Sequence, residues 1–167
     1  EDVANAQDWD NISFSVGVKA KDKMAIQKIK KRNHRVDYLT IDIAHGHSGR
    51  MKAMINWIKR HLPDTKIIAG NVATPSAVRD LALWGADVVK VGIGQGSPCT
   101  TKDKTGFTMP MFSCVKECSG QYVNFECADL PEKEIPIIAD GGIEFNGDIA
   151  KALVAGAKMV MAGGIFA

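Results

Sequence analysis

Six short apolar runs recur along the chain, and most are followed by a stretch with the periodicity of an amphipathic helix. The runs are apolar almost throughout, which is typical of strands that are covered on both faces. Strands that alternate with helices predict a parallel sheet with right-handed crossovers. The predicted strands are Ile12–Val18, Tyr38–Ala44, Lys66–Val72, Asp87–Ile93, Ile135–Ala139 and Lys158–Gly163.

Capping residues mark several of the helices between these strands. Ser48 and Thr74 are suitable N-caps, Pro75 suits a first helical position, and Gly85 ends the second helix. A further helix is predicted near residues 109–119, and a last one runs from about 147 to 156. The side chains expected to face the sheet are Met51, Met54, Ile55, Ile58, Leu62, Val78, Leu81, Ile149, Ala152 and Leu153.

Glycine and polar residues gather after the predicted strands, at 70–71, 92–96, 140–142 and 163–164. In a barrel these positions converge on one mouth, whereas in an open sheet most would lie far from the binding crevice. We therefore predict an α/β fold, a (β/α)₈ TIM barrel with about six of its eight units in this chain. Residues 1–167 are expected to form one partial barrel domain, with residues 121–134 as an irregular surface excursion and the missing strands outside the chain.

Composition excludes some classes of function. The net charge is only +2, and Lys and Arg are scattered over predicted helices, so we expect no nucleic-acid partner. No apolar run approaches the ~20 residues that span a bilayer, and no signal-peptide pattern opens the chain. Cysteines 99, 114, 118 and 127 lack paired zinc spacing, which favours free thiols in a reducing, cytoplasmic setting.

The loop from Gly92 to Thr101 carries the strongest chemical signal. Three glycines at alternate positions allow a tight turn and a close approach to a ligand. Cys99 follows among hydroxyl groups and backbone N–H groups, an environment that favours the thiolate. The loop therefore indicates a nucleophilic cysteine at a strand exit, although an inert cysteine in a glycine-rich connection fits the spacing equally well.

Other strand ends suggest binding groups. Asp140-Gly141-Gly142 and Gly163-Gly164 follow the last two strands, where barrels commonly bind phosphate through backbone N–H groups. Asp140 would lie close to such an anion, and its own negative charge makes it unsuitable as a phosphate ligand. Accepting hydrogen bonds from ribose hydroxyls suits it better.

Three residues near the mouth are harder to assign from the sequence. Asp42 is expected to point into the barrel or to its mouth and to need a partner, while Asn71 either positions a ligand or satisfies turn backbone. His45 and His47 form a His-x-His pair, which either binds metal, as in barrel hydrolases, or shapes the loop and caps the next helix.

These motifs together resemble the IMP dehydrogenase / GMP reductase family. The resemblance runs nearly end to end, through residues 15–18, 41–48, 69–72, 92–101 and 140–143. The segment Lys104-Thr105-Gly106-Phe107, the Asp42-Ile43-Ala44 sequence and the ending at 163–167 are more similar to the reductase branch than to the dehydrogenases.

The resemblance implies a cysteine-based reductive deamination of GMP to IMP, with NADPH as the hydride donor. Cys99 would attack carbon 2 of guanine, and Thr101 would help to move protons at the departing ammonia. The resemblance implies that the nucleotide is bound by Ser97, Asp140, Gly141, Gly142, Gly163 and Gly164. It implies that the cofactor is bound by Asp42, Ile43, Ala44, Asn71, Ile93 and Gly94. It also implies that potassium is bound by the backbone carbonyls of Gly94, Gly96 and Cys99.

The resemblance also implies a homotetramer, and a glutamate partner of Thr101 beyond residue 167. A chain of these 167 residues alone is accordingly expected to be inactive. The loop departs from the family pattern at Gln95 and Pro98, and Thr108 stands where glycine is usual. Three alternatives remain: IMP dehydrogenase, a metal-dependent barrel hydrolase using His45 and His47, and a non-catalytic nucleotide-binding relative.

Overall fold

A computed structural model describes residues 12–32, 34–96, 99–123 and 133–166. Its sheet has six parallel strands in the order β1-β2-β3-β4-β7-β8. The spatial order of these strands follows their order in the chain, as a barrel requires. The strands β5 (Tyr122–Val123) and β6 (Lys133–Glu134), which come between β4 and β7 in the sequence, form a separate two-stranded sheet. The strands are β1 Ser13–Val16, β2 Tyr38–Asp42, β3 Lys66–Val72, β4 Val88–Val91, β7 Ile137–Asp140 and β8 Met159–Met161.

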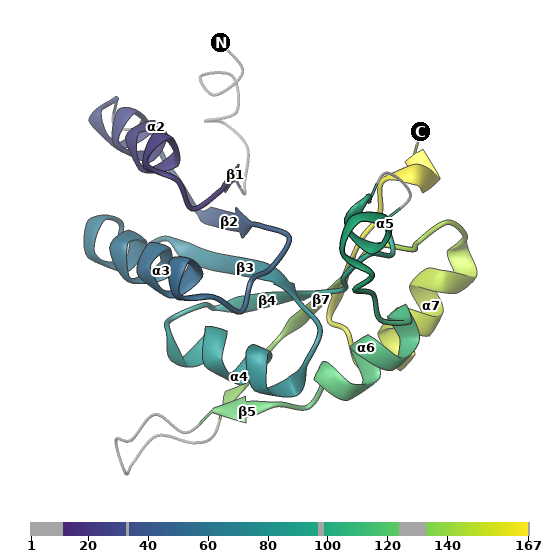
Figure 1. The fold of residues 1–167 in the computed structure, drawn as a ribbon. Helices are drawn as coiled ribbons and strands as arrows, with labels where there is room; N and C mark the ends of the chain where they lie inside the picture. The colour runs from purple at the N-terminus through teal and green to yellow at the C-terminus, as the bar shows by residue number, and fades with distance from the viewer. Residues whose placement is uncertain (1–11, 33, 97–98, 124–132, 167) are drawn as a thin grey trace.

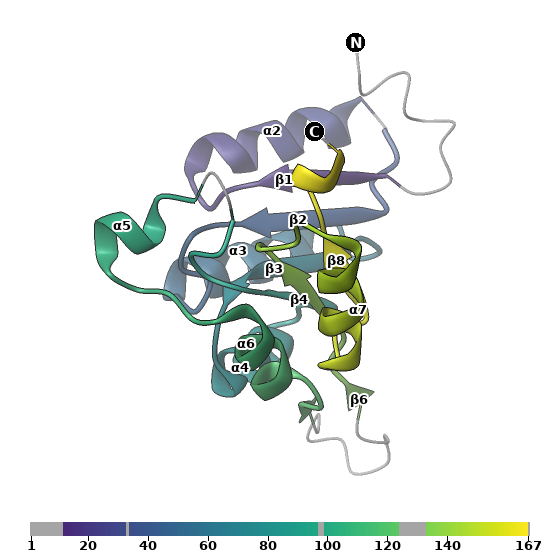
Figure 2. The same cartoon turned by 90° about the vertical axis from the view of Figure 1, so that its right-hand side faces the viewer.

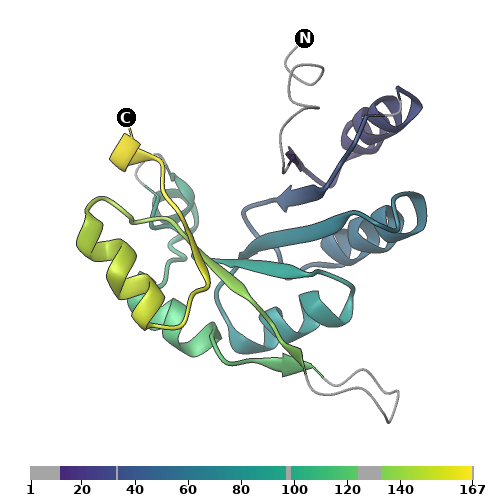
Figure 3. The ribbon, with the colours of Figure 1, turned by 180° about the vertical axis from the view of Figure 1, so that it is seen from behind.

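The sheet curves into an arc, with helices along its outer side and the edge strands β1 and β8 at the two ends of the arc (Figures 1 and 3). This is a parallel-strand part of a barrel, as predicted. The helices are α2 Ala20–Lys31, α3 Gly49–His61, α4 Pro75–Leu83, α5 Thr101–Thr105, α6 Met111–Cys118 and α7 Asn146–Val154, followed by a 3₁₀ turn at Gly164–Phe166.

The core lies between the sheet and its outer helices. Ile41, Ala69, Val89 and Ile137 align across the four central strands, and each is at most 1% exposed. Helices α3 and α4 contribute most of the facing side chains: Met51, Met54, Ile55, Ile58, Ala77, Val78 and Leu81. Because strand side chains alternate, the other set points toward the inside of the arc.

The predicted helix starts are confirmed. The Ser48 hydroxyl accepts a hydrogen bond from the Met51 N–H at 3.4 Å, and the Thr74 hydroxyl accepts one from the Ala77 N–H at 3.3 Å. These bonds satisfy backbone donors that the first helical turn leaves free. Pro75 takes the first position of α4, where its missing N–H costs nothing.

Several predicted boundaries differ from the structure. Five of the six strands are shorter than predicted, because residues at their ends turn into loops; only Lys66–Val72 is confirmed in full. Leu153 was expected to face the sheet but is 46% exposed, since the buried residue of α7 is Ala152. The short helix α5 was missed, and its residues after Thr101 are exposed.

The predicted excursion at 121–134 begins and ends in a short antiparallel pair, β5 Tyr122–Val123 with β6 Lys133–Glu134. Residues 124–132, including Cys127, lie outside the described residues. Figure 2 shows this pair beyond α4 and α6, at the end of the barrel away from α5. Within the described ranges, no helix has the length and apolar character needed to cross a membrane.

Candidate active site

Three adjoining hollows lie at the carboxyl ends of the strands. The first, about 340 Å³, is lined by all six residues predicted to contact a cofactor, together with Cys99 and Thr101. The second, about 330 Å³, contains Cys99 and Asp140. The third, about 250 Å³, is lined by Gly96 and by every described residue predicted to bind the nucleotide: Asp140, Gly141, Gly142, Gly163 and Gly164. Ser97 lies outside the described residues.

Cys99 lies between the first two hollows, just before α5, and its thiol is partly exposed. The Thr101 hydroxyl, and then the Thr101 N–H, hydrogen-bond to the sulfur and lower the pKa of the Cys99 thiol. The Gly94 N–H and the charge of Lys102 act in the same direction. A lowered pKa increases the thiolate fraction at neutral pH, and the thiolate is the nucleophilic form.

The buried cysteines of α6 contrast with Cys99. Cys114 and Cys118 are 0% exposed and free, and their thiols hydrogen-bond to each other. That bond, together with burial, raises the pKa of Cys118. Cys99 is therefore the cysteine that combines access with thiolate character among the described residues.

The loop that carries Cys99 is held by a hydrogen bond to β3 and by one within the loop. Gly92 donates to the carbonyl of Val72 at 2.9 Å, and Cys99 donates to the carbonyl of Gly96 at 2.9 Å. The Gln95 amide donates to the Thr108 hydroxyl at 2.7 Å, and this hydroxyl donates to the Ile93 carbonyl at 3.1 Å. Gln95 and Thr108, two of the departures from the family pattern, thus contact each other.

A buried lysine connects two of the predicted site carboxylates. Lys90, on β4, is 1% exposed, and its ammonium lies 2.7 Å from Oδ2 of Asp140 and 3.2 Å from Oδ1 of Asp42. Lys90 is thus the partner that the sequence led us to expect for Asp42. The Asp42 side chain is 54% exposed, so its carboxylate lies at the mouth and is not buried inside the barrel. In the sequence, Lys90 lies within an otherwise apolar run, and no role was predicted for it.

Asn71 joins the same network and has one unsatisfied atom. Its Nδ2 donates to Oδ2 of Asp140 at 3.0 Å and to the carbonyl of Gly92 at 2.8 Å. Its buried Oδ1 has no hydrogen-bond partner among the described residues. A buried acceptor without a donor is costly, so a ligand that brings an N–H or O–H group there gains from the contact. Asn71 therefore satisfies the backbone carbonyl of Gly92, and its contact with a ligand stays a prediction.

The His-x-His pair does not assemble a metal centre in the described part of the chain. His47 Nε2 lies 2.7 Å from Oδ2 of Asp80 on α4, and His45 is exposed. No group of three His, Cys, Asp or Glu side chains in the described ranges is arranged to hold a metal ion. The further ligands that a barrel hydrolase would need are thus not found among these residues.

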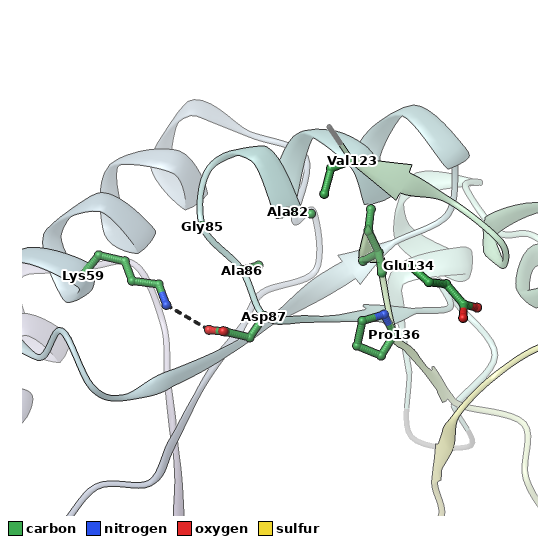
Figure 4. Close-up of a pocket in the computed structure, with 9 residues that line it drawn as sticks. Lys59, Ala82, Gly85, Ala86, Asp87, Val123, Glu134 and Pro136 are labelled. Atoms are coloured by element: carbon green, nitrogen blue, oxygen red, sulfur yellow. Dashed lines mark hydrogen bonds and ion pairs between the residues drawn. The ribbon is translucent and has the colours of Figure 1, made fainter. Parts of the chain in front are cut away.

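A separate hollow, about 190 Å³, lies at the opposite ends of the strands (Figure 4). Its wall includes Lys59, Asp87, Glu134 and Pro136, and none of the predicted site residues. The Lys59 ammonium points to Asp87 across 2.9 Å, at the amino end of β4. Burial alone would raise the pKa of Asp87, but the Ile67 N–H and the two neighbouring lysines lower it overall.

Similarity to known proteins covers nearly the whole chain. Residues 3–167 match the IMP dehydrogenase / GMP reductase domain. The chain belongs to this family. It is 50% identical to the GMP reductase of Helicobacter pylori (strain G27) over 155 residues, which is 93% of this chain and 45% of that protein. The GMP reductase of Bacillus licheniformis gives the same figures, and that of Mesoplasma florum is 49% identical over 158 residues, 93% of this chain and 46% of its own length. The chain thus spans about half the length of the curated relatives it matches.

Proposed function

We propose that this chain carries the cysteine site of a GMP reductase, which converts GMP, NADPH and two protons to IMP, ammonium and NADP⁺. The observation that carries the proposal is the position of Cys99 between two hollows, one lined by the expected cofactor residues and the other reaching Asp140. A nucleophile between two such sites can hold a purine ring where a second ligand can reach it. The names of the similar proteins support the reductase branch.

In the proposed reaction the Cys99 thiolate attacks carbon 2 of the guanine ring, and ammonia leaves to give a covalent thioimidate. Thr101 stabilises the thiolate before attack through its hydroxyl and N–H. The same hydroxyl would pass a proton to the departing amino group. Asp140 would accept from the ribose hydroxyls, and the backbone at Gly142, Gly163 and Gly164 would bind the phosphate.

The first hollow suits a nicotinamide. Oδ1 of Asn71 has no donor among the residues that the structure describes, and a carboxamide NH₂ group would supply one. Asp42, Ala44 and Gly94 would complete the contacts around the ring. When bound there, NADPH supplies the hydride that reduces carbon 2 and releases Cys99.

The same loop offers carbonyl oxygens to potassium. The Gly96 carbonyl already accepts from the Cys99 N–H, but a carbonyl oxygen has a second lone pair and can also bind a cation. We propose a potassium ion bound by the carbonyls of Gly94, Gly96 and Cys99. Replacing potassium by lithium in the buffer should lower nucleotide affinity and raise proteolysis of the loop.

The decisive experiment uses the full-length protein that contains this chain. GMP with NADPH should give IMP and ammonium, whereas IMP with NAD⁺ should give no product. Activity only with IMP and NAD⁺ would assign the chain to the dehydrogenase branch. Cys99→Ala should abolish turnover and retain nucleotide binding; turnover in this variant would refute covalent catalysis.

We further propose that the full-length protein is a cytoplasmic homotetramer. The support is the family membership together with free thiols at Cys99, Cys114 and Cys118. Light scattering after size-exclusion chromatography measures the assembly, and cell fractionation measures the location.

A further inference from the structure

We infer that Lys90 is a positioning residue that fixes the nucleotide-side carboxylate Asp140 and the cofactor-side carboxylate Asp42 in one arrangement. The inference rests on the proposed function for the identity of the ligands, but the bridge itself is a property of the protein. Lys90 lines none of the three hollows at the mouth and is 1% exposed, so its charge is satisfied by protein groups.

Each carboxylate is held by one oxygen. Lys90 lies 2.7 Å from Oδ2 of Asp140 and 3.2 Å from Oδ1 of Asp42. Asn71 also donates to Oδ2 of Asp140, which leaves Oδ1 of that residue without a side-chain donor among the described residues. A carboxylate fixed through one oxygen presents the other at a defined place, and this is what recognition of a ribose hydroxyl needs.

The backbone around Lys90 is built to admit this side chain. A Cβ at Gly70, the neighbouring position on β3, would lie 2.5 Å from Cβ of Lys90 and 2.8 Å from its carbonyl oxygen. The third neighbour of the ammonium is the sulfur of Met161, at 3.8 Å on β8. Lys90 therefore contacts side chains from β2, β7 and β8, three strands whose ends form the mouth.

The charge balance explains why a lysine is needed. Two carboxylates and one ammonium give the cluster a net charge of −1, and removing Lys90 changes it to −2. A site for a phosphorylated ligand is weakened by added negative charge. Without Lys90, Asp140 keeps Asn71 as its one side-chain donor among the described residues and is held less firmly. These two effects can be separated because Asp42→Asn restores the net charge without restoring the Lys90 contact.

The test compares the binding of GMP with that of 2′,3′-dideoxy-GMP, which lacks both ribose hydroxyls, in the full-length protein. Wild-type protein should prefer GMP roughly tenfold, the effect of one good hydrogen bond to a charged group. Lys90→Met should weaken GMP binding and bring the preference close to one. The double variant Lys90→Met/Asp42→Asn should recover the affinity for GMP but not the preference for GMP over the dideoxy nucleotide. Recovery of that preference would show that Lys90 only neutralises charge, and would overturn the inference.

The matched control is Lys59→Met. Lys59 forms an ion pair of similar length with Asp87, at 2.9 Å and at the opposite end of β4, but its side chain is 33% exposed (Figure 4). Loss of this pair should lower stability and leave the GMP preference unchanged. An equal loss of preference in both variants would indicate a general loosening of the sheet and refute a positioning role for Lys90.

A ligand-free measurement keeps the inference separate from the proposed function. A buried, hydrogen-bonded ammonium exchanges slowly with water, so Lys90 should give a resolved ¹⁵Nζ–H signal in wild-type protein that Asp140→Asn shifts or broadens. Wild-type protein that fails to bind GMP would refute the proposed function, and this signal would still test the bridge. Absence of the signal, or no response to Asp140→Asn, would refute the bridge itself.

Discussion

Substitution of Gly92, at the exit of β4, provides the sharpest test of the site's backbone. Gly92 has φ +128°, and a Cβ there would lie 2.2 Å from the backbone oxygen of Asp140 and 3.0 Å from the sulfur of Met111. Gly92→Ala therefore imposes both an unfavourable φ and a clash with backbone of β7, which a side-chain rotation cannot relieve.

Two other glycines separate these contributions. Gly106 has φ +69°, but no described atom lies within 4 Å of the place that a Cβ would take, so Gly106→Ala carries the φ penalty alone. Gly49, the first residue of α3, has neither problem. We expect Gly49→Ala to change stability by less than about 1 kcal/mol in either direction and Gly106→Ala to cost about 1 kcal/mol. Gly92→Ala should cost about 2–6 kcal/mol, from strain of about 1–3 and a forced backbone shift of about 1–3.

Urea unfolding, followed by tryptophan fluorescence, measures the three free energies of unfolding. The m-values should match, because the surface exposed on unfolding is the same. The loss in Gly92→Ala is a large part of the roughly 5–15 kcal/mol that stabilises a domain of ordinary size. A result for Gly92→Ala within about 0.5 kcal/mol of Gly106→Ala, the margin of additive effects, would refute the close approach of β4 to Asp140.

Three further outcomes follow from the structure. Thr101→Val should raise the pKa of Cys99 and slow its alkylation by iodoacetamide about fivefold near neutral pH; peptide mapping checks that the labelled site is Cys99, and an unchanged rate would contradict the role of the hydroxyl. Asp87→Asn should destabilise the fold at pH 7 and progressively less as pH falls below the ordinary aspartate value of 3.8, because a depressed pKa contributes stability that is lost as pH falls through the folded value; a loss that does not shrink with falling pH would exclude this linkage. Thr74→Ala should cost about 1 kcal/mol in urea unfolding through the lost N-cap, whereas Ser76→Ala, in the same first turn of α4 but not the N-cap, should cost less.

The order of elements was predictable because it depends on local patterns. Apolar runs, N-cap residues and helical periodicity located the six strands of the sheet and the starts of α3 and α4. Strand ends were less predictable, since Ile43 and Ile93 are as apolar as strand residues but lie in loops that line the first hollow. Hydrophobicity alone does not distinguish a strand end from a ligand-facing loop.

The Lys90 network was not predicted, although a signal was available. A lysine inside an otherwise apolar strand must either reach solvent or find a carboxylate, because a buried unpaired charge is costly. The sequence has two aspartates at strand ends, Asp42 and Asp140, and a barrel brings strand ends together. What the sequence could not supply is the register across four strands, which decides that both aspartates face the same ammonium.

The glycines at the mouth divide into two groups, and the division bears on the proposed phosphate site. A Cβ at Gly141 would lie 2.9 Å from the backbone nitrogen of Gly96, so this glycine is needed for two loops to pack. At Gly163 and Gly164, no described atom lies within 4 Å of an added Cβ, and neither has a positive φ. Packing among the described residues therefore does not require glycine there, whereas an anion that approaches the backbone would. Gly164→Ala should accordingly weaken nucleotide binding with little change in the stability of this part of the fold, and a stability loss as large as that of Gly92→Ala would remove the argument.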